Sequence, residues 1–178
     1  MKLKIKVKVF DQGTLPNIIK KGDWIDLTSR ETIELNGPQA KMLHKNKKGE
    51  IVERRRDVSF EEITYIKLGV AMELPKGFEA IVVSRSSTPR RHGIVCANSM
   101  AVIDQSYCGD GDEWCFVALA LRHTVIDNNS RIAQFRIQLS QKATFWQKLK
   151  WFLTSSIELV MVDSLNNSNR NGLGSTGV

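Results

Sequence analysis

Residues 2–9 read Lys-Leu-Lys-Ile-Lys-Val-Lys-Val, a strict alternation of lysine with aliphatic residues. Because successive side chains of a β-strand point to opposite faces, this alternation predicts a strand with one buried and one solvated face. Further short segments of strand composition follow, separated by turn residues such as those at 36–38 and 75–77. Many short strands with turns are typical of an all-β sandwich or barrel. The predicted strands are 24–27, 32–35, 63–74, 78–83, 93–96, 100–103, 114–122, 131–139 and 157–162.

Three segments depart from the plain strand pattern. Residues 144–155 place aromatic and leucine side chains, Trp146 and Trp151 among them, at a spacing that predicts a short amphipathic helix. Such a stripe is more often packed on the body or on another subunit than used for a partner or a membrane surface. Residues 40–55 are rich in Lys and Arg and predict a basic hairpin. Residues 165–178 are rich in Asn, Ser and Gly and predict a mobile tail.

Length and cysteine content bound the class of protein. A chain of 178 residues is long enough for one domain with its own hydrophobic core. No apolar run approaches the roughly 18 residues of a membrane span, and the lysine-rich N-terminus lacks the apolar stretch of a signal peptide. Cys96, Cys108 and Cys115 show no metal-like pairing. This pattern indicates a reducing compartment and predicts a cytoplasmic protein without a membrane contact.

The formal net charge of +7 has more than one interpretation. Much of the charge lies on the N-terminal lysines and within residues 41–56, where the ordinary interpretation is a solvated strand face and a solvated loop. No aromatic residues interleave with the basic run to stack on bases, so nucleic-acid binding is not expected. A positive field would also attract a small polyanion, such as a nucleoside triphosphate.

The segment Asn98–Tyr107 indicates a more specific function. Its apolar run stops at an acid, Asp104, and an aromatic ring follows at Tyr107. Folded as a hairpin, the run can present backbone donors and acceptors to a flat nucleobase, with the acid beside it and the ring against a sugar. Taken alone the signal is modest, because Tyr107 could equally be a core aromatic residue and Asp104 a turn cap.

Four other short motifs occur in a particular order around this segment. They are Asp26-Leu27, Arg85-Ser86-Ser87, Arg131-Ile132-Ala133-Gln134 and Gly172-Leu173-Gly174-Ser175-Thr176-Gly177. Together the five resemble the ordered motifs of the deoxyuridine triphosphatase (dUTPase) family, over most of the chain. The resemblance implies an all-β, distorted jelly-roll body over residues 1–164 and a flexible arm over residues 165–178 that closes over the nucleotide. It also implies hydrolysis of dUTP to dUMP and pyrophosphate with Mg²⁺ by a homotrimer, whose sites each draw on several subunits, with the tail crossing to a neighbour.

By that resemblance the hairpin reads the nucleobase and supplies the general base. Asn98 and the hairpin backbone, including that of Ile103, hydrogen-bond uracil and leave no room for the methyl group of thymine. Tyr107 packs on the deoxyribose and excludes a 2′-hydroxyl. Asp104 polarises a water for attack on the α-phosphorus. A positioned general base is typically worth about 10²–10⁴ in rate.

The resemblance assigns the phosphate contacts to the second and fourth motifs. Ser86 and Ser87 would donate to the α–β phosphate region, and Arg85 would supply charge or brace the site. The amide of Gln134 would contact phosphate, and Arg131 would support the site. Hydroxyl, amide and guanidinium groups suit such a cradle for a polyanion.

The first motif supplies the predicted metal contact. By resemblance, Asp26 helps to hold the hydration shell of Mg²⁺, an ion usually held through substrate phosphates and water. Trp24 stands where the family has a small residue, and Asp23 is a nearby rival for the role. In the second motif, Thr88 replaces the usual aliphatic residue, a change expected to affect packing rather than chemistry.

The tail resembles the fifth motif. Glycines such as Gly174 free the backbone to approach the nucleotide, and Ser175 and Thr176 add hydroxyl donors for the β and γ phosphates. Leu173 stands where the family usually has a phenylalanine that stacks on uracil, so we expect closure without aromatic stacking. Arg170 would support the site, and it lies closer to the motif core than the usual arginine.

Two alternatives share this fold. One is a deoxycytidine triphosphate deaminase, which also carries an Arg-Ser-Ser motif but typically has Pro-Gly after its acid. Here Gln-Ser-Tyr follows Asp104, which favours the triphosphatase. The other is a nucleotide-sensing protein that interacts with a further, unidentified protein partner.

Overall fold

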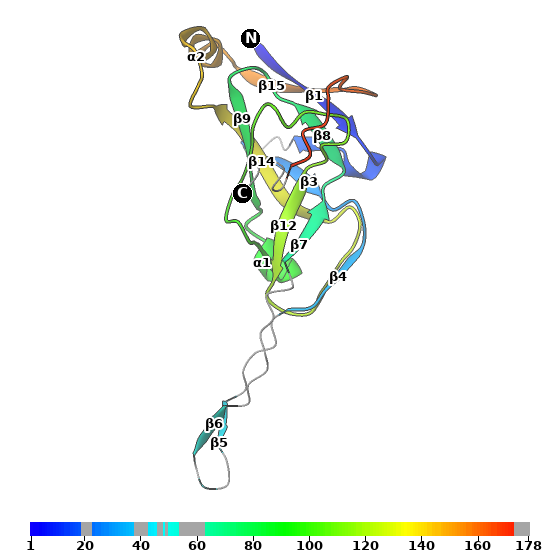
Figure 1. Ribbon diagram of the computed structural model, residues 1–178, viewed down its shortest axis with the longest axis vertical. Helices are drawn as coiled ribbons and strands as arrows, with labels where there is room; N and C mark the ends of the chain where they lie inside the picture. The colour runs from blue at the N-terminus through cyan, green and yellow to red at the C-terminus, as the bar shows by residue number, and fades with distance from the viewer. Residues whose placement is uncertain (19–22, 38–42, 46–47, 49, 54–62, 173–178) are drawn as a thin grey trace.

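The computed structural model describes residues 1–18, 23–37, 43–45, 48, 50–53 and 63–172. Within these residues the regular secondary structure is mostly β-strand, as the sequence predicts. Strands β1 to β15 are joined by turns, a single-turn 3-10 helix η1 (Gln12–Thr14) and the short helices α1 and α2. In Figure 1, α2 and the β5–β6 hairpin lie at opposite ends of the molecule, with the other strands between them.

The alternating N-terminal segment forms the central strand of one sheet. β15 runs parallel to β1 on one side, and β8 runs antiparallel to it on the other. The aliphatic residues Leu3, Ile5 and Val7 are at most 1% exposed, whereas Lys2, Lys4 and Lys6 between them are exposed. The alternation predicted from the sequence is therefore confirmed. The strands are β1 (Lys2–Val9), β8 (Val70–Glu73) and β15 (Ser156–Met161).

The largest sheet carries four of the predicted motifs. Its strands are antiparallel and follow the order β11-β9-β14-β3-β2. Opposite β3, the register of β14 shifts between Arg131 and Ala133, at a bulge. β14 has the bounds predicted from the sequence. The strands are β2 (Asn17–Ile18), β3 (Ile25–Thr28), β9 (Phe78–Ser84), β11 (Ala101–Ile103) and β14 (Arg131–Leu139).

The remaining strands form a three-stranded sheet, β10-β12-β7, and the pairs β13-β4 and β5-β6. The predicted basic hairpin is confirmed, because β5 and β6 pair antiparallel. The strands differ from the prediction in three places: β2 and β13 were not predicted, and residues 63–74 form two strands, β7 and β8, rather than one. The strands are β4 (Ile33–Leu35), β5 (Leu43–Lys45), β6 (Ile51–Glu53), β7 (Ile63–Lys67), β10 (Ile94–Cys96), β12 (Cys115–Ala120) and β13 (Thr124–Ile126).

Gly69 explains the break between β7 and β8. Its φ of 68° lies in the left-handed region, which favours glycine. A Cβ at this position would lie 2.2 Å from Thr14 Oγ1, and the Thr14 hydroxyl donates to the Gly69 carbonyl at 3.0 Å. The chain therefore turns here and passes from one sheet to another.

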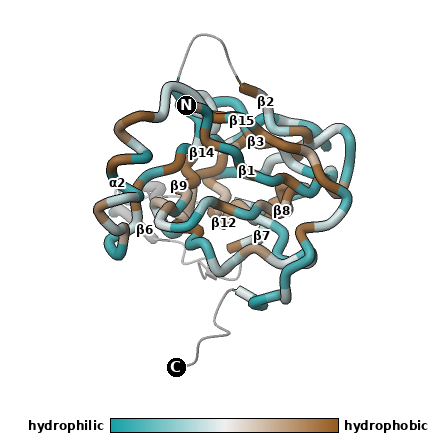
Figure 2. The backbone as a smooth tube through the Cα atoms, turned by 90° about the horizontal axis from the view of Figure 1, so that it is seen from above, coloured by the Kyte–Doolittle hydropathy of each residue, from teal (hydrophilic) through white to brown (hydrophobic). Residues whose placement is uncertain are grey.

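The core lies between the sheets. Trp114, Phe78, Phe116 and Phe135 are its largest fully buried side chains. The rings of Trp114 and Phe135 pack edge to face with centroids 5.2 Å apart. Figure 2 shows hydrophobic stretches of β9, β12 and β14 in the middle of the body. This arrangement is the all-β body that the strand pattern predicts.

The predicted aromatic helix is present as α2 (Phe145–Phe152). Thr144 and Gln147 form a reciprocal capping box at its N-terminus. Trp151 packs against Phe78, with ring centroids 5.4 Å apart, but Trp146 is 74% exposed. One face of the helix is thus packed on the body and the other is open. No helix in the described part of the chain is long and apolar enough to span a membrane.

Candidate active site

The predicted base-reading hairpin, Asn98–Tyr107, is instead a turn after β10, the short strand β11 and a loop, because β10 pairs with β12 whereas β11 pairs with β9 in another sheet. Asn98 is exposed, and its Oδ1 accepts a hydrogen bond from Cys96 Sγ at 3.0 Å. Ser99 has a φ of 61°, and Met100 N donates to Asn98 O at 2.6 Å, which makes a tight turn. The chain then enters β11, which ends at the half-buried Ile103. β11 is an edge strand of its sheet, so its outer backbone groups face away from β9 and are placed to meet a planar ligand.

Asp104 follows directly after this edge strand. Its Oδ1 accepts hydrogen bonds from the backbone N (2.8 Å) and the hydroxyl of Ser106, and its Oδ2 pairs with Arg170 Nη1. Partial burial acts to raise the pKa of Asp104, but the hydrogen bonds from Ser106 and Arg170 outweigh it and lower the pKa below 3.8. The carboxylate is therefore ionised at neutral pH, as a general base must be. Its side chain remains 48% exposed, so water can reach it.

Tyr107 lies three residues after Asp104, and its backbone N donates to the Asp104 carbonyl at 3.1 Å. Its hydroxyl donates to the Glu113 carbonyl at 3.0 Å, which fixes the ring. Burial raises the pKa of Tyr107 to about 12, and the Cys115 thiolate that forms at high pH and the carboxylates of Asp112 and Glu113 act in the same direction. The phenol therefore stays protonated, and the half-buried ring offers an apolar face rather than a charge.

A second cluster joins the first, second and fourth motifs. The carboxylate of Asp26 is 2% exposed and accepts hydrogen bonds from Arg85 Nε at 2.8 Å and from Arg131 Nη1 at 3.4 Å. Arg85 Nη1 also donates to the Arg131 carbonyl at 3.3 Å. The register of the sheet explains the cluster, because Asp26 lies opposite Gln134, and Gln134 lies opposite Val83, two residues before Arg85. Asp26 thus holds the guanidinium groups of both arginines in place.

The hydroxyl residues of the second motif follow Arg85. Ser86 is exposed and Ser87 is half-buried just before α1 (Thr88–His92). Thr88 is fully buried and donates to the Ile132 carbonyl at 2.7 Å, so the change from an aliphatic residue adds a hydrogen bond in the packing. Gln134 Nε2 donates to the Ser84 carbonyl at 3.3 Å, which places its amide beside the same turn.

The two clusters lie at opposite ends of β9. Ile103, next to Asp104, pairs with Ala80, whereas Arg85 follows the last residue of the strand. Five residues separate Ala80 from Arg85, about 16 Å at about 3.3 Å per residue of strand. Within one chain, Asp104 and the cluster of Asp26, Arg85 and Arg131 therefore lie toward different ends of this strand.

Sequence analysis missed the acidic loop after Tyr107. Asp110 and Asp112 bind backbone N–H groups of Leu165, Arg170 and Asn171 near the end of the chain. Only the Gly-Asp-Gly-Asp composition of residues 109–112 pointed to a loop, and it carried no signal of its partner. The other predicted contacts of the arm, Leu173, Gly174, Ser175 and Thr176, lie outside the described residues.

The described side chains form no protein cage for a metal. No group of three or more His, Cys, Asp or Glu residues among them is placed to hold a metal ion. Both carboxylate oxygens of Asp26 already accept from guanidinium groups. These residues fit an Mg²⁺ ion held on phosphate oxygens and water, with Asp26 reaching at most its hydration shell.

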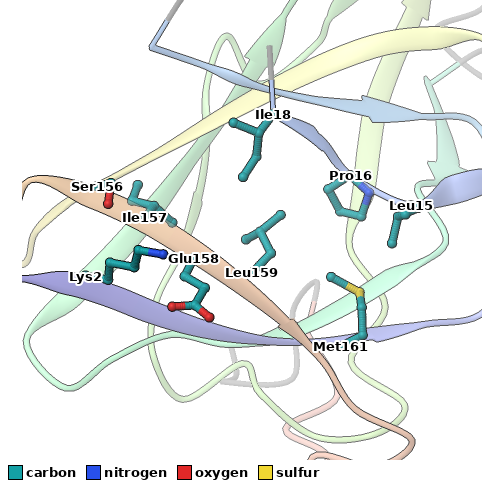
Figure 3. Close-up of a pocket in the computed structure, with 9 residues that line it drawn as sticks. All are labelled: Lys2, Leu15, Pro16, Ile18, Ser156, Ile157, Glu158, Leu159 and Met161. Carbon is teal, nitrogen blue, oxygen red and sulfur yellow. The ribbon is translucent and has the colours of Figure 1, made fainter. Parts of the chain in front are cut away.

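An apolar groove elsewhere on the body does not suit a triphosphate. It has a volume of about 460 Å³ and runs along β15. Figure 3 shows Ile18, Leu159 and Met161 around a shared space, with Lys2 and Glu158 as the charged residues at its edge. None of the predicted site residues lines it. One lysine beside a glutamate cannot neutralise a polyanion, so the groove is not the catalytic centre.

Comparison with known proteins decides the family. The chain is 39% identical to the SPβ prophage-derived deoxyuridine 5′-triphosphate nucleotidohydrolase of Bacillus subtilis over 176 residues, which cover 98% of this chain and 99% of that protein. The chain belongs to the deoxyuridine 5′-triphosphate nucleotidohydrolase (dUTPase) family. The dUTPase of Rickettsia felis is 35% identical over 117 residues, covering 66% of this chain and 70% of that protein. No protein-family model matches the chain.

Solved structures share the dUTPase fold. The crystal structure of dUTPase from Streptococcus mutans matches with a TM-score of 0.59 at 18% identity, and the match covers 78% of this chain and 98% of that one. The dUTPase of Staphylococcus bacteriophage 80alpha with dUPNHPP matches with a TM-score of 0.55 at 18% identity, covering 98% of each chain. The fold and family expected from the five motifs are therefore confirmed, and the deaminase alternative is disfavoured.

Proposed function

We propose that this dUTPase hydrolyses dUTP to dUMP and pyrophosphate with Asp104 as the general base. The observation that carries the assignment is the Asp104 carboxylate, ionised and half-exposed at the end of an edge strand. In the proposed complex, the outer backbone of Asn98–Ile103 binds the uracil edge and the face of Tyr107 supports the deoxyribose. Asp104 then takes a proton from a water that attacks the α-phosphorus, and the bond to the bridging oxygen of pyrophosphate breaks.

The phosphate cradle would come from the cluster at the other end of β9. Ser86 is exposed there, and Arg85 and Arg131 are held in place by the buried Asp26. The amide of Gln134 lies beside the same turn. Mg²⁺, when bound to the triphosphate, neutralises charge that develops on the leaving pyrophosphate. Such positioning and charge stabilisation account for most of phosphoryl-transfer catalysis.

The separation of the two clusters supports a homotrimer. About 16 Å of strand between Ala80 and Arg85 is too far for one chain to place both the general base and the cradle on the α-phosphate. A neighbouring subunit that presents its Arg85 cluster to this Asp104 would complete the site. Because the family resemblance implies three subunits, sedimentation of the purified chain should give the mass of a trimer, and a monomer with full activity would contradict the shared site.

A hydrolysis panel tests the function. Purified protein with Mg²⁺ is given dUTP, dCTP, dTTP or UTP, and pyrophosphate and ammonia are both measured. We expect pyrophosphate from dUTP alone, because the backbone of Asn98–Ile103 selects the base and Tyr107 the sugar. Ammonia from dCTP would instead establish a deaminase. Equal rates with UTP would remove the sugar contact from Tyr107.

We further propose that the protein works in the cytoplasm and binds a protein partner. Its three cysteines are free thiols, which a reducing compartment maintains.

The outer face of α2 exposes Phe145, Trp146 and Phe152. A nucleotide-dependent partner would contact such an apolar surface. Binding that survives replacement of Trp146 and Phe152 by serine would exclude this face.

A further inference from the structure

The backbone carbonyl of Glu113 holds the Tyr107 ring in place. The Tyr107 hydroxyl donates to this carbonyl at 3.0 Å, and the ring packs against the hydrophobic core. A phenol hydroxyl has a single hydrogen to donate, so this bond directs the hydroxyl toward the carbonyl and away from a ligand. The position of the ring therefore depends on where the backbone of Glu113 lies.

The side chain of Glu113 fixes that backbone. It is only 11% exposed, and both of its carboxylate oxygens have partners. Oε1 accepts a hydrogen bond from the backbone N of Gly69 at 2.9 Å, and Oε2 pairs with Arg30 Nη1 at 3.2 Å. A buried charge is tolerated when it is paired and hydrogen-bonded, and hydrogen bonds to a charged group are stronger than neutral ones. The carboxylate thus holds the residue at two points.

Both partners of the carboxylate belong to the body rather than to the loop before Glu113. Gly69 lies between β7 and β8, and its carbonyl accepts a hydrogen bond from Phe10 N at 2.8 Å. The backbone N of Arg30, which follows β3, donates to the Lys67 carbonyl at 2.9 Å. The Arg30 guanidinium also lies over the Phe10 ring, 5.6 Å from the ring centroid. Glu113 therefore connects the start of β12 to two segments that are distant in the sequence.

The ring of Tyr107 selects the sugar in the proposed complex. Its face lies on the deoxyribose and leaves no room for a 2′-hydroxyl, so a displaced ring would admit a ribonucleotide more readily. We propose that Glu113 is a positioning residue of this dUTPase, whose buried carboxylate fixes the carbonyl that holds Tyr107 and thereby sets the preference for dUTP over UTP. Glu113 acts only through Tyr107 in this scheme. The proposal rests on the proposed sugar contact of Tyr107.

NMR of the tyrosine rings tests the contact between Glu113 and Tyr107 without any measurement of activity. The chain has two tyrosines, and Tyr65, which is 50% exposed, serves as the internal reference. Protein with ¹³C-labelled tyrosine rings gives signals from both, and Tyr65→Phe assigns them. In Glu113→Ala we expect the Tyr107 signals to shift or broaden and those of Tyr65 to stay in place. Unchanged Tyr107 signals would overturn the proposal.

Two further variants support this measurement. Glu113→Gln keeps the size of the side chain and one acceptor oxygen, so it should fold even if Glu113→Ala does not. We expect it to move the Tyr107 signals in the same direction by a smaller amount, because only the charge is lost. Glu31→Ala removes an exposed carboxylate close to Glu113 and is the matched control. The control should leave the Tyr107 signals in place, and an equal shift in the control would overturn the proposal.

The ratio of kcat/KM for dUTP to kcat/KM for UTP tests the effect on specificity. We expect Glu113→Ala to lower this ratio by about tenfold, because a small displacement of a positioning group is enough to change discrimination. Glu31→Ala should keep the native ratio. A merely structural role would lower both values of kcat/KM by the same factor. An unchanged ratio in Glu113→Ala would therefore overturn the proposal.

A double-mutant cycle tests whether Glu113 acts through the Tyr107 hydroxyl. Tyr107→Phe keeps the ring and removes the hydrogen bond to the Glu113 carbonyl. In this background Glu113→Ala should change the ratio little further, and an equal fall in both backgrounds would overturn the proposal. Wild-type protein with equal rates on dUTP and UTP would instead defeat the proposed sugar contact. Tyr107 signals that still move in Glu113→Ala would then leave the structural part of the proposal standing.

Discussion

Asp26→Asn tests how the first motif supports the site. Asp26 is 2% exposed, and its partners differ: the side chain of Arg85 is 19% exposed at 2.8 Å, whereas that of Arg131 is 48% exposed at 3.4 Å. Breaking a buried ion pair costs about 3–5 kcal/mol, but an exposed pair contributes only about 0–1 kcal/mol. Arg85 therefore carries most of the cost. Because an Asn oxygen can still accept from Arg85, we expect a loss of about 2–4 kcal/mol.

Urea unfolding followed by tryptophan fluorescence measures this loss. All variants are compared at one protein concentration, because the stability of an oligomer depends on it. Asp23→Asn is the matched control, since Asp23 is 82% exposed and 3.9 Å from Arg136. The control should change the free energy of unfolding by about 0–1 kcal/mol. A loss in Asp26→Asn no larger than in this control would refute the bracing of Arg85 and Arg131.

Magnesium titration of the same variant separates two roles of Asp26. If Asp26 also holds the hydration shell of the ion, the Mg²⁺ concentration for half-maximal activity rises in Asp26→Asn. A Mg²⁺ dependence equal to that of the native protein would leave Asp26 as a brace for the arginines and contradict the metal role.

Variants at three further positions test the site and its packing. Asp104→Asn should fold and bind nucleotide but lose about 10²–10⁴ in kcat, and near-native turnover would remove Asp104 from the role of general base. Arg170→Gln removes a donor and a positive charge that lower the pKa of Asp104, so this pKa should rise and the acidic limb of kcat/KM should move to higher pH; an unmoved limb would contradict the pairing. Thr88→Val loses the hydrogen bond to Ile132 and should cost about 0.5–1.5 kcal/mol in urea unfolding, whereas Thr88→Ser, which keeps the hydroxyl, tests whether that bond is the cause.

Local pattern predicted much of the fold. The alternation in residues 2–9 predicted β1, and the apolar run ending at Asp104 predicted the strand β11, because both depend on residues adjacent in the sequence. The expected hairpin was wrong, because β11 pairs with β9 and not with β10. The break at Gly69 escaped prediction, because the sequence shows the glycine but neither its left-handed φ nor the close approach of Thr14. Strand composition alone cannot show such a contact.

For the candidate site, too, the residue types could be predicted from the sequence but their contacts could not. Its residue types were predicted from five short motifs, but their grouping into two clusters was not. Asp26 meets Arg85, 59 residues away, only through the register of β3, β14 and β9. The contacts of Asp112 were missed for the same reason, because its partners are backbone N–H groups that every residue but proline carries.

The sequence by itself determined the all-β class and the order of the motifs, since the side-chain period and the residue types can be read along the chain. The tertiary structure decided which of these residues meet. It put Asp104 and Arg85 at opposite ends of one strand, and it brought the chain end back to Asp112. Such meetings depend on strand register and loop closure over many residues, and neither is a property of any local segment.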